Sequence, residues 1–249
     1  LDAHPPGLIV VAGLDPRPHA QATAVDVILP SGRGAFFRIL VRQLIAARPP
    51  VRTAVIAETK DALRTPRQLR RLVETFVVVP PLTYAQQLAQ AMQRFPQLLV
   101  IDHLTPESTP LAAAAAQRGL CVLSQIDTIF RGADVAMALL DLGAPQAALD
   151  HLHWVVSVQR MAMLCPHCKR PTPLQADQAA SLRQRFPSLI DLLDSTWYDA
   201  DGCPACQHSG RHGDVAAFDI YRGDSAADHR HHRRGLLSLE EYALRLAAA

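Results

Sequence analysis

The chain has 249 residues, which is enough for one large domain or for a domain with a small appended module. Hydrophobic residues make up 49% and charged residues 19%, so the composition is that of a globular protein able to bury a sizeable core. A formal net charge of +2 argues against a broad phosphate-neutralising surface, and we do not expect nucleic acid as a partner. The basic stretch 229–234 is predicted to be a solvated loop.

Signals for membrane crossing and secretion are missing from the sequence. No apolar run reaches the roughly 18 residues needed to cross a bilayer. The chain starts at Leu1 without a Met or a signal-peptide pattern, so we expect a piece of a longer, non-secreted protein. Four of the 5 cysteines form two CxxC pairs, which fits a reducing compartment better than a disulfide framework. The expected location is the cytoplasm.

From Gly7 to about Gly143, short apolar runs alternate with helical patterns, which is typical of a parallel α/β sheet. The predicted buried strands are Leu8–Ala12, Val27–Leu29, Ala54–Ala57, Leu98–Ile101 and Cys121–Ser124. The predicted helices are Ala35–Ala47, Tyr84–Phe95 and Leu111–Arg118. Their apolar stripes are expected to face the core rather than a cofactor.

The second half of the chain changes character after the turn at Gly143–Pro145. A helical pattern resumes over Ala147–Ser157. The segment from Cys165 to about Asp219 carries the paired cysteines and a polar helical insert, Gln175–Leu193. The tail, Ser238–Ala248, is predicted to be a helix that starts with a capping box.

Two cysteine pairs of the same Cys-Pro-x-Cys form carry the strongest chemical signal. They are Cys165 with Cys168, and Cys203 with Cys206. Each CxxC turn brings two thiolates onto one tetrahedral ion, so two turns complete the shell of a structural zinc site. A pair of redox dithiols is the alternative, but neither CxxC opens an evident βα unit. Cys121 is predicted to be a small core residue.

The residues around these cysteines resemble the C-terminal half of the type II secretion and type IV pilus assembly ATPases. The family has a Gln-Arg pair followed by Leu-Cys-Pro-x-Cys-Lys, as in Gln159-Arg160 and Leu164–Lys169. The second pair continues to Gly210 and Gly213 in the family's pattern, with Asp214 in place of an arginine.

The resemblance covers nearly the whole chain in the same order. The Leu82–Ala85 segment is similar to the family's Leu-Thr-Phe-Ala, and Val122–Ser124 is similar to the strand before its histidine box. Leu239–Glu241 also has a counterpart there. The resemblance implies an α/β fold with a RecA-like P-loop NTPase core at residues 1–160. A small tetracysteine zinc module at 161–222 and a C-terminal helical tail at 223–249 complete the expected organisation.

Such an ATPase needs a phosphate loop with glycines, a lysine for the phosphates and Ser/Thr for magnesium. Leu14–Ala20 is one possible position, but it lacks the glycines and puts His19 at the lysine. Pro30–Phe37 is the better match, because Gly32, Arg33 and Gly34 resemble the family's Gly-Ser-Gly. In both positions the lysine and the hydroxyl are missing, so this loop is predicted to be vestigial.

The other motifs of the family depart in the same direction. Glu58 stands in its Ile-Glu-Asp-Pro segment, and Asp102 takes the place of its catalytic glutamate. Asp127 occupies the histidine box, whose first histidine is missing. Loss of the lysine alone removes several kcal/mol of transition-state stabilisation. We therefore expect three vestigial site residues, zinc as the cofactor, and doubtful binding of ATP and magnesium.

The resemblance thus implies a catalytically degenerate motor domain that acts as a structural or regulatory subunit. It would join a ring with itself or with an active paralogue, and dock on the inner-membrane platform of a bacterial pilus or secretion machine. Its location would be cytoplasmic and peripheral to the inner membrane.

Two other interpretations stay open. The chain is alternatively a weak or unorthodox ATP-binding motor, in which Arg33 replaces the lysine and Glu58 and Asp102 hold the metal. Arg33 is otherwise an ordinary exposed loop arginine. A nucleic-acid-binding zinc ribbon is a third reading, opposed by the near-neutral charge and the 5% aromatic content.

Overall fold

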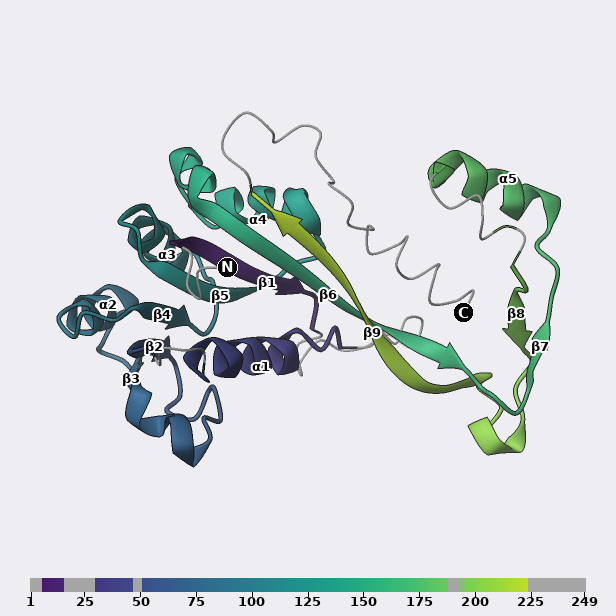
Figure 1. Ribbon diagram of the computed structural model, residues 1–249, viewed down its shortest axis with the longest axis horizontal. Coiled ribbons are helices and arrows are strands. Elements are labelled where there is room, and N and C mark those ends of the chain that lie inside the picture. The colour runs from purple at the N-terminus through teal and green to yellow at the C-terminus, as the bar shows by residue number, and fades with distance from the viewer. Residues whose placement is uncertain (1–5, 16–29, 47–50, 188–192, 194, 224–249) are drawn as a thin grey trace.

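A seven-stranded sheet runs through the chain in the order β3-β2-β4-β5-β1-β6-β9 (Figure 1). Its neighbouring strands are parallel except β6 and β9, which pair antiparallel. The computed structural model describes residues 6–15, 30–46, 51–187, 193 and 195–223. The strands of the sheet are β1 (Gly7–Gly13), β2 (Thr53–Ala57), β3 (Val73–Val77), β4 (Leu98–Ile101), β5 (Cys121–Asp127), β6 (Leu152–Leu164) and β9 (Arg211–Arg222).

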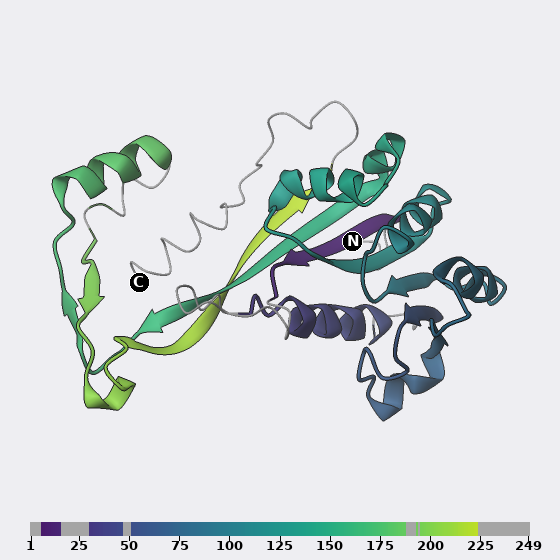
Figure 2. The ribbon, with the colours of Figure 1, turned by 180° about the vertical axis from the view of Figure 1, so that it is seen from behind.

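Helices cover both faces of this sheet (Figures 1 and 2). Successive apolar residues of β1 alternate between the faces, so Val11 packs with α1 (Arg33–Ala46) and Val10 packs with the opposite layer. The opposite layer contains α2 (Tyr84–Met92), α3 (Ser108–Gln117), α4 (Val135–Asp141) and the short 3-10 helix η3 (Gln146–His151). Because both faces are covered, the central strands are mostly apolar.

The predicted mostly parallel α/β sheet is confirmed. β1, β2, β4 and β5 lie where the apolar runs place them, and α1, α2 and α3 match the expected helices to within a few residues. α2 begins with a capping box between Thr83 and Gln86, which satisfies its first backbone N–H groups. The expected strand Val27–Leu29 lies outside the described residues.

The helix predicted over Ala147–Ser157 is wrong. A 3-10 turn ends at His151, and β6 begins at Leu152. Val155 and Val156 are buried because β6 lies between β1 and β9, and these two neighbours decide the local conformation. The sequence pattern also missed β3 and β9. Both are edge strands with many polar residues, so neither shows a buried apolar run.

The strands β6 and β9 continue beyond the sheet as a two-stranded ribbon (Figure 1). β1 pairs with β6 only as far as Ser157, whereas β9 stays paired with β6 to Leu164. We call residues 165–210, at the far end of the ribbon, the cysteine module. It contains β7 (Lys169–Pro171), α5 (Ala176–Arg185), β8 (Tyr198–Ala200) and the 3-10 turn η5 (Pro204–Cys206).

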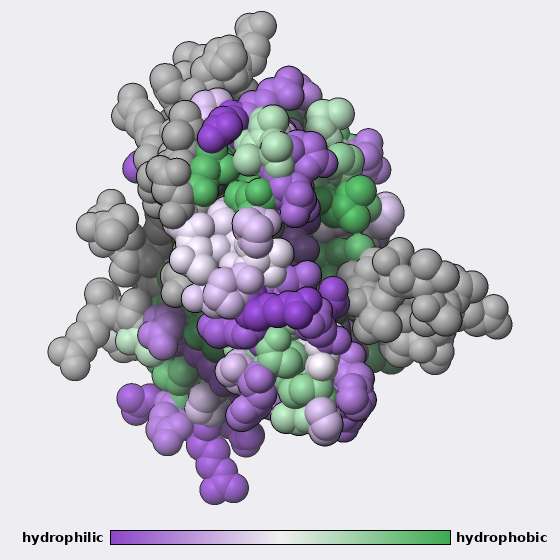
Figure 3. All heavy atoms as spheres, turned by 90° about the vertical axis from the view of Figure 1, so that its right-hand side faces the viewer, coloured by the Kyte–Doolittle hydropathy of each residue, from purple (hydrophilic) through white to green (hydrophobic). Residues whose placement is uncertain are grey.

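The polar insert predicted over Gln175–Leu193 is helical at α5, and it separates the two strands of the module. The surface turned to this end of the molecule carries hydrophilic side chains between smaller hydrophobic patches (Figure 3).

The basic stretch 229–234 and the tail helix Ser238–Ala248 lie outside the described residues. The expected boundary between residues 160 and 161 falls within β6, and the division into three domains stays a prediction.

Candidate functional site

The candidate site lies where the carboxyl ends of several parallel strands meet. Gly13 ends β1, Asp102 follows β4, and Asp127 ends β5. These three strands are next to one another or separated by one strand in the sheet. Ligands of open α/β sheets bind outside the carboxyl ends of the strands, so this edge is where a nucleotide would be expected.

Helix α1 begins at Arg33, directly after Gly32. Gly32 has a φ of 80°, a backbone conformation that L-residues rarely adopt, so a glycine suits this position. The Pro30–Phe37 segment therefore meets the strand edge at the start of a helix, as a phosphate loop would. His19, the lysine position of the other placement, lies outside the described residues.

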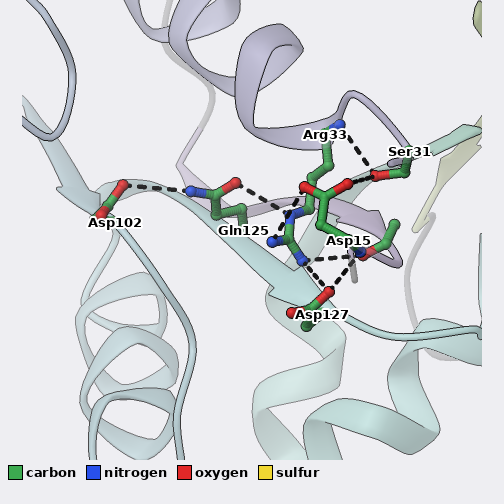
Figure 4. A network of polar contacts seen from close by, with 7 residues as sticks. Asp15, Ser31, Arg33, Asp102, Gln125 and Asp127 are labelled. Carbon is green, nitrogen blue, oxygen red and sulfur yellow. Dashed lines mark hydrogen bonds and ion pairs between the residues drawn. The ribbon is translucent and has the colours of Figure 1, made fainter. Parts of the chain in front are cut away.

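The side chain of Arg33 is buried under the start of α1 and contacts four other residues (Figure 4). Its Nη1 lies 2.9 Å from Asp127 Oδ1 and donates to the carbonyl oxygen of Gly13 at 2.9 Å. Its Nη2 lies 3.6 Å from Asp15 Oδ2, and its Nε donates to Gln125 Oε1 at 3.2 Å. The reading of Arg33 as an ordinary exposed loop arginine is therefore wrong.

The same carboxylates close the loop around the helix start. The backbone N–H of Arg33 donates to Ser31 Oγ at 3.1 Å, and the Ser31 hydroxyl donates to Asp15 Oδ1 at 2.7 Å. The N–H of Asp15 donates to Asp127 Oδ1 at 2.9 Å. A hydroxyl and a carboxylate of the chain itself thus occupy a place where helix N-termini usually hold anions. We call these residues, with Gly13 and Gln125, the Arg33 network.

The carboxylates of the Arg33 network outnumber its one guanidinium. One guanidinium faces two carboxylates, Asp15 and Asp127, so the group is negative when all three are ionised. Both carboxylates are less than a third exposed, and the Arg33 side chain is 7% exposed.

Asp102 borders the network through an amide. Gln125 Nε2 donates to Asp102 Oδ1 at 3.3 Å, while Gln125 Oε1 accepts from Arg33. Burial raises the pKa of Asp102, and nearby His103 and the Gln125 hydrogen bond partly oppose this shift. Burial also lowers the pKa of His103. The sequence predicts Asp102 to be a vestigial site residue. Its carboxylate is held by a hydrogen bond from Gln125.

Glu58 is exposed and makes no hydrogen bond or ion pair with the described residues. Its charge contributes to the raised pKa of Asp102 and to that of Tyr84, which burial raises to about 12. The three residues therefore share one acidic neighbourhood at the carboxyl ends of β2 and β4. Glu58 makes no direct contact with Arg33 among the described residues.

The first turn of α1 carries small and apolar side chains after Gly34. These include Ala35 and Phe36. The Phe36 ring packs against Phe218 of β9, with centroids 5.0 Å apart. This turn anchors the helix to the sheet by apolar contact.

The four cysteines converge in the module, as the sequence predicts. Their sulfurs lie within 4.8 Å of one another. The Cys165–Cys203 and Cys168–Cys206 sulfur distances are both 3.9 Å, and the Cys203–Cys206 distance is 3.8 Å. Four ligands at about 2.3 Å from a tetrahedral ion are about 3.8 Å apart, whereas a disulfide bond is only about 2 Å long. The donor set and its spacing therefore fit a single metal ion.

Backbone groups orient these sulfurs. The N–H of Cys203 donates to Cys206 Sγ at 3.2 Å and lowers the pKa of that thiol to about 6. The N–H of Cys165 donates to the carbonyl oxygen of Gly210, which joins the two cysteine turns. The hydrogen bond from Cys203 favours the thiolate form that a metal requires at Cys206, whereas burial raises the pKa of the neighbouring Cys168 thiol.

Sequence reasoning missed three members of the Arg33 network: Asp15, Ser31 as a cap, and Gln125. Asp15 and Gln125 lie next to strand ends, which is a weak signal for a site at the sheet edge. Their partners are far away in the chain, so spacing alone does not reveal them.

Comparisons with known proteins agree with the motifs. A sequence model of the family described as "Type II/IV secretion system protein" matches residues 79–245, more than half of the chain. The chain belongs to this family. The type II secretion system ATPase E of Vibrio cholerae is 24% identical over 147 residues, 58% of this chain and 28% of that protein. The type IV pilus assembly ATPase PilB of Myxococcus xanthus is 28% identical over 141 residues, 56% of this chain and 24% of that protein.

This secretion-family chain spans about a quarter of the length of these relatives, as the covered shares of 28% and 24% show. The pilus retraction motor PilT with bound ADP is a solved structure with a TM-score of 0.49 and 14% sequence identity. The similarity covers 89% of this chain and 49% of that one. The family match includes Asp102, Asp127 and all four cysteines, and it begins after Arg33 and Glu58.

Proposed function

We propose that this chain is a catalytically degenerate member of the secretion ATPase family, which serves a pilus or secretion motor as a structural or regulatory subunit. The Arg33 network carries this proposal. A buried guanidinium, two carboxylates and a hydroxyl fill the strand edge where phosphates would bind. The family relationship supplies the context of a secretion machine.

Electrostatics supports the loss of catalysis. Phosphoryl transfer relies on fixed positive charge and a metal to stabilise the transferred group. Here the positive charge of Arg33 is already neutralised by its own carboxylates, and Phe36 contacts Phe218 instead of a metal. Binding of ATP would require the chain to break several buried polar contacts, each of which costs free energy when left unpaired.

Nucleotide binding and turnover test this proposal directly. We expect no change in the fluorescence of a labelled ATP analogue and no magnesium-dependent phosphate release, with an active pilus assembly ATPase as the positive control. Magnesium-dependent turnover that disappears in Asp102→Ala would refute the proposal, since it would show a working site at this sheet edge.

A weak ATP-binding motor is the alternative, favoured by the position of Arg33 at the helix start. In that case Arg33 would leave its carboxylates and bind a phosphate oxygen, and Glu58 and Asp102 would hold the metal. ATP binding at low salt would then be measurable for the wild type and lost in Arg33→Ala. Our proposal expects no binding in either protein.

We also propose that the cysteine module holds zinc as a structural ion. Four thiolates leave no open position for a substrate, which is the arrangement of structural sites. Elemental analysis should find one zinc per chain in the wild type and a loss of most of it in Cys206→Ser. Cys121→Ser is the matched control, because Cys121 is a buried cysteine of β5 outside the cluster. Equal metal content in all three proteins, or none in any, would contradict the zinc assignment.

The partners of this subunit follow from the same proposal. It would assemble into a ring with itself or an active paralogue, on the cytoplasmic side of the inner-membrane platform. Among the described residues, no helix has the length and apolar composition that a membrane crossing requires. Native mass spectrometry of the chain mixed with an active family member should show mixed oligomers; separate species only would contradict mixed ring assembly.

A further inference from the structure

In the described part of the chain, the outer edge of β3 has backbone groups without a hydrogen-bond partner. β3 is the last strand on its side of the sheet. The N–H of Val78 donates to Ala57 of β2, so by alternation the peptide groups of Thr75 point away from β2. The Val77 carbonyl, on the same outer side, accepts from Gln87 Nε2 at 2.7 Å. Among the described residues, Thr75 has no backbone partner on this edge.

A groove runs along this edge, and we call it the β3 groove. One part has a volume of about 540 Å³ and is lined by the strand itself and by polar side chains of α2 and the turn after it. These side chains are Gln87, Gln90, Gln93 and Arg94. A second hollow of about 170 Å³ continues past the start of β3 and is lined by Arg52, Arg71 and Arg94 among others. Amides and guanidinium groups thus accompany the strand along its length.

The charge in the groove is positive. Arg94 pairs with Glu74 at 3.3 Å across the edge, and both side chains are more than half exposed. Arg52 and Arg71 are exposed, and no carboxylate among the described residues pairs with either of them. The 3-10 helix η1 (Arg67–Leu72), which precedes β3, adds the exposed Arg67 and Arg70. This local excess contrasts with a net charge of only +2 for the whole chain.

We infer that the β3 groove is a docking site for an acidic protein segment, which adds to β3 as an extended strand. The outward peptide groups of Thr75 would pair with the backbone of the segment, as in other strand-addition complexes. Carboxylates on alternate residues of the segment would reach Arg52 and Arg71, whose planar guanidinium groups match carboxylate geometry. This inference is independent of the state of the nucleotide site.

The groove favours a peptide over a lipid surface. An open strand edge offers paired donors and acceptors at the spacing of a peptide backbone, and a lipid headgroup cannot use both. The side chains that accompany it are glutamines and arginines rather than the aromatic residues of a membrane interface. The open edge of β3 and the arginines that line the β3 groove together fit an extended acidic chain.

Fluorescence anisotropy with a synthetic peptide tests the inference. The probe is a fluorescein-labelled peptide of alternating Glu and Val, and its control has Lys in place of Glu. Binding of the Glu peptide, no binding of the Lys peptide, and weakening with added salt are expected. Absence of binding by the Glu peptide at low salt, or equal binding of both peptides, would overturn the inference.

Two pairs of variants separate charge from strand addition. Arg71→Glu should weaken binding about tenfold, while Arg118→Glu, an exposed change of the same charge at the end of α3, should not. Thr75→Pro removes only an outward N–H and should also weaken binding, whereas Thr75→Val keeps that N–H and should bind like the wild type. Circular dichroism confirms that each variant is folded.

If Thr75→Pro binds as well as Thr75→Val, strand addition is wrong. If the groove instead serves a lipid surface, vesicles of phosphatidylglycerol and phosphatidylcholine will retain the wild type but not Arg71→Glu, and the peptide will not bind. That result would overturn the proposal for a protein segment.

Discussion

The buried side chain of Arg33 fills the carboxyl edge of the strands with ion pairs and hydrogen bonds. Its guanidinium lies within 3.6 Å of two carboxylates. Because the side chain is buried, these contacts are screened less than surface ion pairs. The residue therefore acts as a structural cation in this position.

Removal of that cation should destabilise the protein. Arg33→Ala leaves Asp15 and Asp127 close together without a positive partner, and we expect a loss of about 3 kcal/mol in the free energy of unfolding. Urea denaturation measures it, with Arg118→Ala as an exposed control expected within about 0.5 kcal/mol of the wild type. An Arg33→Ala protein as stable as the control would show that the network adds nothing to the fold.

Asp102 should give a pH-dependent effect of known sign. Its raised pKa means that the folded protein holds this proton more tightly than the unfolded chain. The resulting stability is present at low pH and is lost as pH rises through the folded pKa. Asp102→Asn escapes that loss, so its stability relative to the wild type should be higher at pH 7 than at pH 4. A difference that is constant with pH, or larger at pH 4, would contradict the shift.

The cysteine site was predictable from sequence and the Arg33 network was not. A CxxC turn is local, so its geometry follows from four consecutive residues. A metal site then requires only that two such turns lie close together in the fold. Arg33, by contrast, meets Gln125 and Asp127 from a distant part of the chain, and only the sheet order brings them together.

The strands β6 and β9 show that pairing with neighbouring strands can determine secondary structure against the local sequence pattern. The sequence of β6 has apolar residues at helical spacing, and the helical prediction for its start failed because β1 and β9 pair with both of its edges. The parallel strands β1, β2, β4 and β5 were predictable because burial on both faces leaves an apolar run. Edge and ribbon strands lack that burial, so their sequences carry little signal.

Arg160 and Asp214 join β6 to β9 beyond the edge of β1. Arg160 Nε donates to Asp214 Oδ1 at 2.8 Å, and the same guanidinium makes a second contact to Oδ2. These hydrogen bonds lower the pKa of Asp214. A bidentate pair fixes orientation better than a single contact does.

Loss of this pair should loosen the ribbon without unfolding the sheet. In Asp214→Ala we expect faster amide hydrogen exchange over residues 211–218 and unchanged exchange in β1 and β5. Asp177→Ala, at an exposed position on α5, is the control. Unchanged exchange in the ribbon of Asp214→Ala would show that the strand ladder alone holds it.

At the scale of the whole molecule, the sheet and the cysteine module are two separate sources of stability. The sheet buries two apolar layers, whereas helix α5 of the module has no buried residue. A part of the chain with so little apolar burial depends on other constraints, such as a metal. The module is therefore expected to respond to chelation and the sheet is not.

The two tryptophans of the chain allow this to be measured, because Trp154 lies in β6 and Trp197 lies in the module. With Trp154→Phe, the emission of Trp197 should shift to longer wavelength when a chelator removes the metal. With Trp197→Phe, the emission of Trp154 should not change. A parallel shift in both variants would mean that the metal stabilises the whole chain as one unit.

The ribbon that carries the module has a mechanical consequence. β6 extends from Val158 to Leu164 with β9 as its partner in the sheet, which is a reach of about 23 Å at about 3.3 Å per residue. A rotation of about 10° at its root would displace the cysteine end by about 4 Å. The ribbon therefore acts as a lever. A small twist at the edge of β1 would move the cysteine end, and any protein bound to the module, by nearly the spacing between two strands.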